Sequence, residues 1–230
     1  MGVAILGDVL YDAVLNTFMQ DRTKRTRKAG RPREFDEGEV LEKMQRKLWT
    51  TGLSGVSLDG IARSAGLNRP SLAAAFGNKD EIYAQAAAKY VALMDERLSQ
   101  AIDAKDLDVA LKSAFAAAID IYTDDGPGGC FVICTAPAEA LTNPVCRSLL
   151  DQALRAIDAL FLQRLKKEKL RTHARRADLS VLAEMLGATL HTVALRARAG
   201  WPRERLLNLS TGAVDQVLAA LGRSPASRKR

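Results

Sequence analysis

Apolar residues recur every three or four positions along most of the chain, which is the spacing of one face of an α-helix. No segment shows the strict alternation of apolar and polar residues that is typical of a half-buried strand. The sequence therefore predicts an all-α protein. Helices are expected at 36–51, 58–65, 68–77, 79–104, 107–123, 129–141, 144–170, 177–199 and 202–221.

Several helix ends are marked by local signals. Asp36 with Glu39, and Asn78 with Glu81, have the spacing of capping boxes, in which two side chains satisfy unpaired backbone N–H groups at a helix start. The run Asp-Asp-Gly-Pro-Gly-Gly at 124–129 predicts a loop.

The two ends of the chain have a different character. Residues 3–18 carry an apolar stripe that fits a short helix. They also fit an unpacked extension, or a stretch that precedes a true start at Met19. A signal peptide is not expected, because the start is not basic and two acidic residues interrupt the apolar run. The basic run at 22–33 predicts a flexible arm, and a short basic tail is expected from residue 223.

The segment 57–77, SLDGIARSAGLNRPSLAAAFG, fits the helix-turn-helix template. Ala62 is the small residue needed where the two helices cross, and Gly66 can adopt the positive φ that the turn requires. A helical hairpin without DNA binding shares only some of these features. The second helix of such a unit enters the major groove of DNA. The residues expected to lock the two helices together are Ile61, Ala65, Leu67, Leu72 and Ala75.

Charge supports a nucleic-acid partner. The chain has 34 Lys and Arg against 27 Asp and Glu, a formal net charge of +7. Residues 21–78 carry 12 of these cations and 7 of the anions. Such an excess favours contact with phosphates. Because no run approaches 18 consecutive apolar residues, no membrane span is expected and the protein is predicted to be cytoplasmic.

Three elements carry a family resemblance: Gly-Arg-Pro-Arg at 30–33, the run SLDGIARSAG at 57–66, and Phe-Gly-x-Lys-x-x-Ile at 76–82. Together they resemble the DNA-binding region of TetR-family transcriptional regulators, over residues 30–86 or about a quarter of the chain. One position departs from the family pattern. Ala73 stands where the family usually has a tyrosine that packs or contacts a phosphate, which puts one backbone contact in doubt.

The resemblance implies DNA contacts for nine residues. Ser57 and Lys79 would bind phosphates at two helix starts, where the helix dipole favours an anion. Arg69 and Ser71 would face base edges or the nearby backbone, and Pro70 would approach sugar or thymine methyl groups. The arm arginines would reach the minor groove or backbone, or remain solvated. The full set is Arg31, Arg33, Ser57, Asn68, Arg69, Pro70, Ser71, Ala73 and Lys79.

The resemblance also implies an order of domains: an extension and arm at 1–29, a helix-turn-helix DNA-binding domain at 30–78, a ligand-binding and dimerisation domain at 79–222, and a tail at 223–230. Helices 177–199 and 202–221 would form a homodimer interface, although their apolar stripes also fit an intramolecular core. These stripes comprise Leu179, Leu182, Leu186, Leu190 and Val193, then Leu206, Leu209, Ala213, Val217, Ala220 and Leu221.

A small-molecule effector would bind among the central helices. The low aromatic content, 5%, argues against a large planar ligand, and the effector itself is not predicted. The same helical stripes also fit ordinary core. Candidate ligand-binding residues are Met94, Phe115, Ile119, Tyr122, Phe131, Cys134, Leu154 and Phe161.

Cys130 and Cys134 are four residues apart and allow three interpretations. They pack as small hydrophobic residues, react as sensors of electrophiles or oxidants, or bind metal with help from His173 or His191. His191 lies on an apolar helix face, so a hydrogen-bonded core or interface histidine is expected. Three cysteines are too few for a disulfide framework. Neither a metal site nor a cofactor is expected.

Enzyme motifs are absent: there is no phosphate loop, no H-E-x-x-H and no G-x-S-x-G. The sequence predicts a transcriptional regulator, most simply a repressor, that binds double-stranded operator DNA as a homodimer under the control of a small molecule. Two alternatives stay open. One is a non-specific nucleoid-type DNA-binding protein, and the other is a helical binding module that has lost DNA binding.

Overall fold

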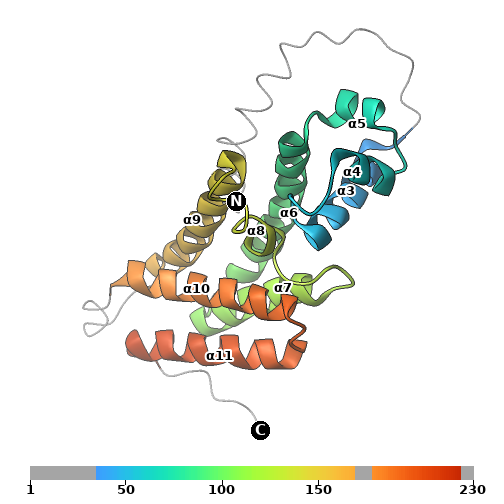
Figure 1. Ribbon diagram of the computed structural model, residues 1–230. Helices are drawn as coiled ribbons and strands as arrows, with labels where there is room; N and C mark the ends of the chain where they lie inside the picture. Colours follow the sequence, from blue (N-terminus) through green and yellow to red (C-terminus); the bar gives the residue numbers. More distant parts are fainter. Residues whose placement is uncertain (1–34, 169–177, 224–230) are drawn as a thin grey trace.

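A computed structural model describes residues 35–168 and 178–223, and every regular element within these ranges is an α-helix (Figure 1). The predicted helix at 3–18, the basic arm with Arg31 and Arg33, His173 and most of the basic tail lie outside the described residues. The helices are α3 (Glu37–Thr51), α4 (Leu58–Ser64), α5 (Arg69–Phe76), α6 (Lys79–Ile102), α7 (Leu107–Thr123), α8 (Phe131–Thr135), α9 (Pro144–Lys166), α10 (Leu179–Arg198) and α11 (Arg203–Ala220).

Helices α3, α4 and α5 form a small unit at one end of the molecule (Figure 1). The Asp36 carboxylate caps α3 by accepting from Gly38 N at 2.7 Å and Glu39 N at 3.0 Å. Gly66, with φ +72°, makes the turn between α4 and α5, as the sequence predicts. The inner faces of these helices carry the buried side chains of Met44, Leu48, Ile61, Leu72 and Phe76.

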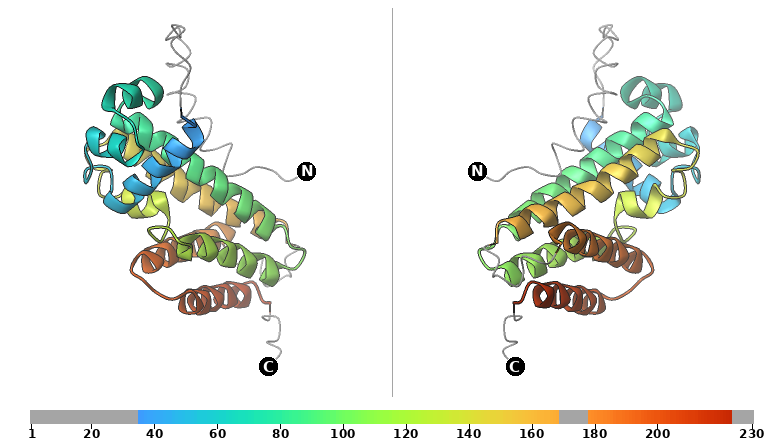
Figure 2. Two further views of the ribbon diagram at one scale, coloured as in Figure 1. Left: turned by 90° about the vertical axis from the view of Figure 1, so that its right-hand side faces the viewer. Right: turned by 90° about the vertical axis from the view of Figure 1, so that its left-hand side faces the viewer.

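Helix α6 leads from this unit to the far end of the molecule and runs beside α9 (Figure 2). Its start carries the predicted capping box, with Glu81 N donating to Asn78 Oδ1 at 3.0 Å and Asn78 N to Glu81 Oε2 at 2.6 Å. At its other end, Arg164 of α9 is only 6% exposed and donates to the carbonyls of Ile102 and Ala104 at 3.2 and 3.1 Å. Both ends of α6 are therefore held by polar contacts.

Helices α10 and α11 form a hairpin at the end of the molecule opposite α5 (Figure 1). Helix α10 packs on α9, and α11 packs on α7. Lys112 of α7 joins the latter pair, because its ammonium group lies 2.6 Å from Asp108 and 2.9 Å from Asp215 of α11. None of the helices in the described ranges is long and apolar enough to cross a bilayer.

Two predicted helices are wrong in extent, while the other seven agree to within two residues. The helix expected at 129–141 is only the five residues of α8, and turns follow it. Pro137 explains this, because proline lacks an N–H and clashes with the carbonyl four residues earlier. Helix α9 ends at Lys166 rather than at residue 170.

Candidate nucleic-acid interface and buried polar core

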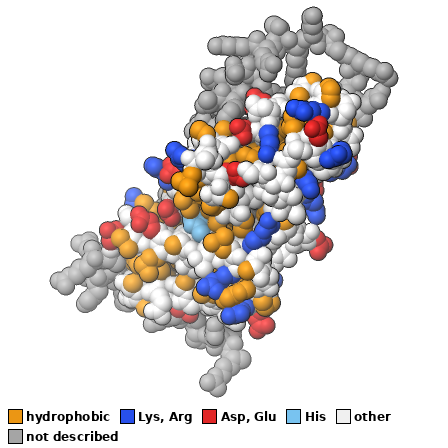
Figure 3. All heavy atoms as spheres, in the orientation of Figure 1, with side chains coloured by type: hydrophobic (Ala, Val, Ile, Leu, Met, Phe, Trp, Pro, Cys, Tyr) orange, Lys and Arg blue, Asp and Glu red, His pale blue; other side chains and the backbone are white. Residues whose placement is uncertain are grey.

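Helix α5 has one buried and one exposed face. Leu72, Ala75 and Phe76 are buried against the rest of the N-terminal unit. The opposite face carries the exposed residues Arg69, Pro70, Ala73 and Ala74. This face meets solvent at the end of the molecule where Figure 3 shows several basic side chains. Arg69 is the one charged side chain in α5.

Ser57 and Asn68 serve first as helix caps. Ser57 Oγ accepts from Gly60 N at 3.1 Å, and Asn68 Oδ1 accepts from Ser71 N at 2.8 Å. Both side chains are exposed. Each oxygen accepts one backbone bond, while the Ser57 hydroxyl hydrogen and the Asn68 NH₂ group are not used by these caps. Both are donors, which suits phosphate oxygens and base acceptors.

Arg69 and Lys79 are the predicted cationic contacts within the described residues. Arg69 Nη1 lies 3.5 Å from Asp59 Oδ2, and both side chains are largely exposed, so this pair is weak and leaves the guanidinium available. Lys79 is half-buried in the first turn of α6, at the helix end that attracts anions. Ala73 is exposed on the same side as Arg69 and offers no hydrogen-bonding atom.

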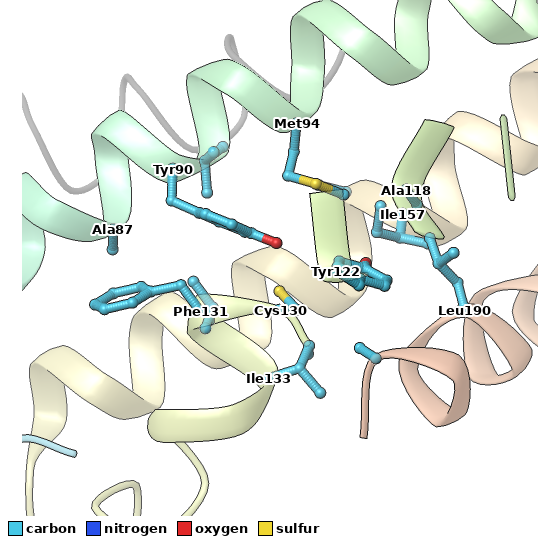
Figure 4. Packing of buried hydrophobic residues seen from close by; sticks show 14 of the residues in the cluster. Ala87, Tyr90, Met94, Ala118, Tyr122, Cys130, Phe131, Ile133, Ile157 and Leu190 are labelled. Carbon is cyan, nitrogen blue, oxygen red and sulfur yellow. The ribbon is translucent and has the colours of Figure 1, made fainter. Parts of the chain in front are cut away.

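Part of the predicted ligand set gathers where α6, α7 and α8 meet (Figure 4). Met94, Tyr122 and Phe131 are buried there, beside Tyr90 and Cys130. The Tyr90 hydroxyl is buried and forms no hydrogen bond of good geometry within the part of the chain that the structure describes. Burial raises the pKa of Tyr90 well above its usual value. The neighbouring Cys130 thiol is only a weak hydrogen-bond partner.

Of the remaining ligand candidates, Cys134 lies near Tyr90 and Tyr122, whereas the two phenylalanines pack against each other. Phe115 of α7 and Phe161 of α9 stack on each other with ring centroids 5.6 Å apart, so they pack the two helices together. Ile119 is buried, and Leu154 is half-buried. The Cys134 thiol lies 3.9 Å from the Ala194 carbonyl of α10.

The environment of the cysteines favours packing over reactivity. Burial raises the pKa of Cys134 to about 11 and that of Cys146 to about 12, and it also raises the pKa of Cys130. Thiols with such pKa values stay protonated near neutral pH, and the protonated thiol is a poor nucleophile and metal ligand. Among the described residues, no three His, Cys, Asp or Glu side chains are grouped to hold a metal ion.

His191 departs from the expected hydrogen-bonded histidine. Its Nε2 atom is buried and has no hydrogen-bond partner among the described residues. Burial lowers the pKa of His191 to about 4, so the imidazole is neutral at physiological pH.

The predicted dimer stripe is wrong for α10, because its apolar residues form the core of the single chain. Buried members of that stripe are Leu182, Leu186, Leu190 and Val193. On α11, Leu206, Val217 and Leu221 are likewise buried, Leu209 and Ala213 are half-buried, and Ala220 is exposed. A second stripe on α10 faces outward instead, and comprises Val181, Met185, Ala188, Thr192 and Leu195.

The candidate ligand set leaves out Tyr90 and Trp49. Tyr90 lies four residues before Met94 on the same buried side of α6, and that spacing was the available signal. The Trp49 ring packs edge-on against Tyr90, with centroids 5.1 Å apart, and against Phe131 at 6.0 Å. Trp49 belongs to α3, so these contacts join the N-terminal unit directly to the buried residues around Tyr90, where α6, α7 and α8 meet.

Comparison with known proteins gives a consistent picture. The family model described as "Bacterial regulatory proteins, tetR family" matches residues 46–86. The HTH-type transcriptional repressor ComR of Escherichia coli (strain K12) is 27% identical over 198 residues, which cover 83% of this chain and 93% of ComR.

Solved structures extend the similarity to the fold. The TetR family transcriptional regulator CifR, solved as a cysteine mutant complexed with 26bp double-strand operator DNA, is 26% identical and covers 80% of this chain and 98% of its own, with a TM-score of 0.72. A TetR-family transcriptional regulator from Streptomyces coelicolor shares the fold at 16% identity and a TM-score of 0.65, covering 81% of this chain and 95% of its own.

Proposed function

The chain belongs to the TetR family of bacterial transcriptional regulators, and from this premise we propose that it is a homodimeric repressor released from its operator by a small molecule. TetR-family regulators bind DNA and are not enzymes. The observation that carries the proposal is the exposed face of α5, which begins with an arginine and is held at its start by the Asn68 cap.

In the proposed complex, α5 lies in the major groove. Arg69, Pro70 and Ser71 face base edges, while Ser57, Asn68 and Lys79 donate to phosphates. Ala73 makes only van der Waals contact. The arm residues Arg31 and Arg33 belong to the same proposed interface. Phosphate contacts orient the reading helix, and base contacts select the sequence.

The proposed dimer forms through the outward stripe of α10. Its residues recur at alternating intervals of four and three, the pattern of helices that pack side by side. Val181 and Leu195 are equally far from Ala188, so an antiparallel pair of α10 helices crossing at Ala188 would set Val181 against Leu195 of the partner subunit. A two-fold dimer matches a palindromic operator with half-sites about 34–36 Å apart.

The proposed effector is a small, mainly apolar molecule with a hydrogen-bond acceptor such as a carbonyl oxygen. Among the described residues, the buried Tyr90 hydroxyl has only the Cys130 thiol as a weak partner, and a carbonyl oxygen would be a stronger acceptor for it. Tyr90 and Met94 belong to α6, the helix that begins at the DNA-facing end. The effector releases DNA only if it binds better to the arrangement of α6 that does not fit the operator.

Footprinting on DNA that flanks the coding region tests this function. We expect two protected half-sites, one helical turn or a multiple apart and related by approximate two-fold symmetry. A single unsymmetrical footprint, or uniform protection without boundaries, would contradict a dimeric repressor. Compounds with and without a carbonyl group, otherwise matched in size, can then be compared for release of the bound fragment.

A further inference from the structure

Arg198 makes a contact between parts of the chain that are far apart in sequence. It is the last residue of α10, yet its Nη2 atom donates to the carbonyls of Trp49 at 2.7 Å and Thr50 at 3.4 Å. Both carbonyls belong to the last turn of α3, where carbonyl groups lack helical partners. Helix α3 has no basic residue of its own in that turn. Arg198 thus supplies both the donors and the positive charge that a helix C-terminus favours.

The loop at 124–129 fills the space between the same two helices. Arg198 Nη1 donates to Pro127 O at 2.9 Å, and Arg46 Nη1 of α3 donates to Asp125 O at 3.2 Å. Gly129 has φ +72°, and a Cβ there would lie 2.5 Å from the Ala194 carbonyl of α10. This close approach means that the loop is packed directly on α10 on one side and bonded to α3 on the other.

Further polar contacts join the segment after α8 to the N-terminal unit and the start of α9 to α6. Ser54, just after α3, donates to the Glu139 carboxylate through N at 2.9 Å and through Oγ at 2.6 Å. Asn143, the cap of α9, donates from Nδ2 to Asp80 Oδ1 of α6 at 2.9 Å. The N-terminal unit is therefore held to the helical domain at several points besides α6, and Arg198 is the one that reaches α10.

We propose that Arg198 is a positioning residue that fixes the orientation of the helix-turn-helix unit relative to α10, and thereby sets the half-site spacing that the dimer accepts. The inference rests on the proposed homodimeric function. Helix α10 carries the outward stripe of Val181, Met185 and Leu195, which is the proposed dimer interface. Because Arg198 bonds the last turn of α10 to α3, it fixes the position of each reading helix relative to that interface. Without the guanidinium fork, the last turn of α3 would lose its direct hydrogen bonds to α10, and the orientation of the unit relative to α10 would be less strictly fixed.

The test compares full-length variants on a series of operators. The starting operator is selected from random-sequence DNA with the wild-type protein, and further fragments have one base pair added or removed between the half-sites. Arg198→Gln removes the charge and the fork, while Arg198→Lys keeps the charge but not the fork. Arg203→Gln is the matched control, since Arg203 bonds Asp120 on the surface at 2.7–2.8 Å and does not contact the N-terminal unit.

We expect the wild type and Arg203→Gln to lose about tenfold or more in affinity when the spacing changes by one base pair. Both Arg198 variants should bind the starting operator about tenfold more weakly and discriminate less than about threefold between spacings. A merely structural role would lower affinity for all fragments alike, so an unchanged spacing preference in the variants would overturn the inference.

Melting temperature and oligomeric state are measured for each variant. If Arg198→Gln does not fold, the spacing preference of Arg198→Lys alone tests the inference. A wild-type protein that selects no paired half-sites would overturn the proposed function, and this inference with it. A wild-type protein that selects them, together with variants that keep its spacing preference, would overturn the inference alone.

Discussion

Single side chains at the DNA-facing end divide into two kinds. Ser57 and Asn68 each accept one backbone hydrogen bond as caps and keep their donors free of these cap bonds. Arg69 and Lys79 keep their charged groups available. In the proposed complex the helix caps and the DNA contacts thus involve neighbouring residues, and the two cations differ in the contacts proposed for them.

Substitution of these cations should give different patterns. Lys79→Ala should weaken binding to all DNA sequences by a similar factor and reduce the slope of log affinity against log salt by about 1, because one phosphate contact is lost. Arg69→Ala should cost about 1–3 kcal/mol on the operator and relax selection at one base pair. Competition binding over several salt concentrations checks both. Equal losses on operator and random DNA for Arg69→Ala would contradict its placement at a base edge.

His191 should make stability depend on pH. Its folded-state pKa of about 4 lies below the ordinary value of 6.5, so the unfolded chain takes up a proton first as pH falls. The contribution is fully favourable above pH 6.5 and is lost progressively towards pH 4, by roughly 3 kcal/mol. Urea unfolding from pH 8 to pH 4 should show this loss in the wild type relative to His191→Leu. Parallel stability curves for the two proteins would show that His191 does not titrate in this way.

At the scale of helices, local signals predicted most helix ends. A capping side chain bonds backbone groups only two or three residues away, so the cap can be recognised in the local sequence. The Asn78–Glu81 box marks the start of α6 as expected. The prediction of a helix at 129–141 was wrong because the apolar spacing continues past Pro137, whereas the helical backbone cannot continue through a proline. The stripe on α10 failed for another reason. Periodicity predicts that Leu186 and Leu190 are buried, but it does not say whether the same chain or a second copy covers them.

The approach of the 124–129 loop to α10 gives a prediction about Gly129. Gly129→Ala introduces both a positive φ for alanine and a clash with the Ala194 carbonyl. Gly200→Ala is the control, since Gly200 has φ +82° with no atom within 4 Å of the added Cβ. We expect Gly200→Ala to cost about 1 kcal/mol of unfolding free energy. Gly129→Ala should cost about 1–3 kcal/mol more. Equal melting temperatures for the two variants would contradict the close packing of loop and helix.

At the scale of the whole molecule, the polar contacts to the N-terminal unit come from distant segments. Arg198 and Trp49 are separated by 149 positions, and no local pattern in either helix anticipates their contact. The same holds for Tyr90, because its buried place beside Cys130 depends on how three helices meet (Figure 4). The helix-turn-helix unit could be predicted because its signals lie within 21 consecutive residues, at 57–77.

The proposed dimer interface can be tested by introducing negative charges on the outward stripe of α10. Met185→Glu and Leu195→Glu place carboxylates on the outward stripe of α10, where both side chains are 52% exposed. Val109→Glu is the control, because Val109 is 50% exposed on α7, outside the stripe. Sedimentation should show monomers for the α10 variants and a dimer for the wild type and the control. Dimers that persist in both α10 variants would place the interface elsewhere.

The most direct test of specific operator recognition measures binding to DNA that flanks the coding region, with random DNA as competitor, over a range of salt concentrations. We expect tight binding that survives an excess of competitor, because base contacts from α5 add to the phosphate contacts. Equal and steeply salt-dependent affinity for both DNAs would contradict the account and favour a nucleoid-type protein. No binding to either DNA at low salt would favour a helical module without DNA recognition.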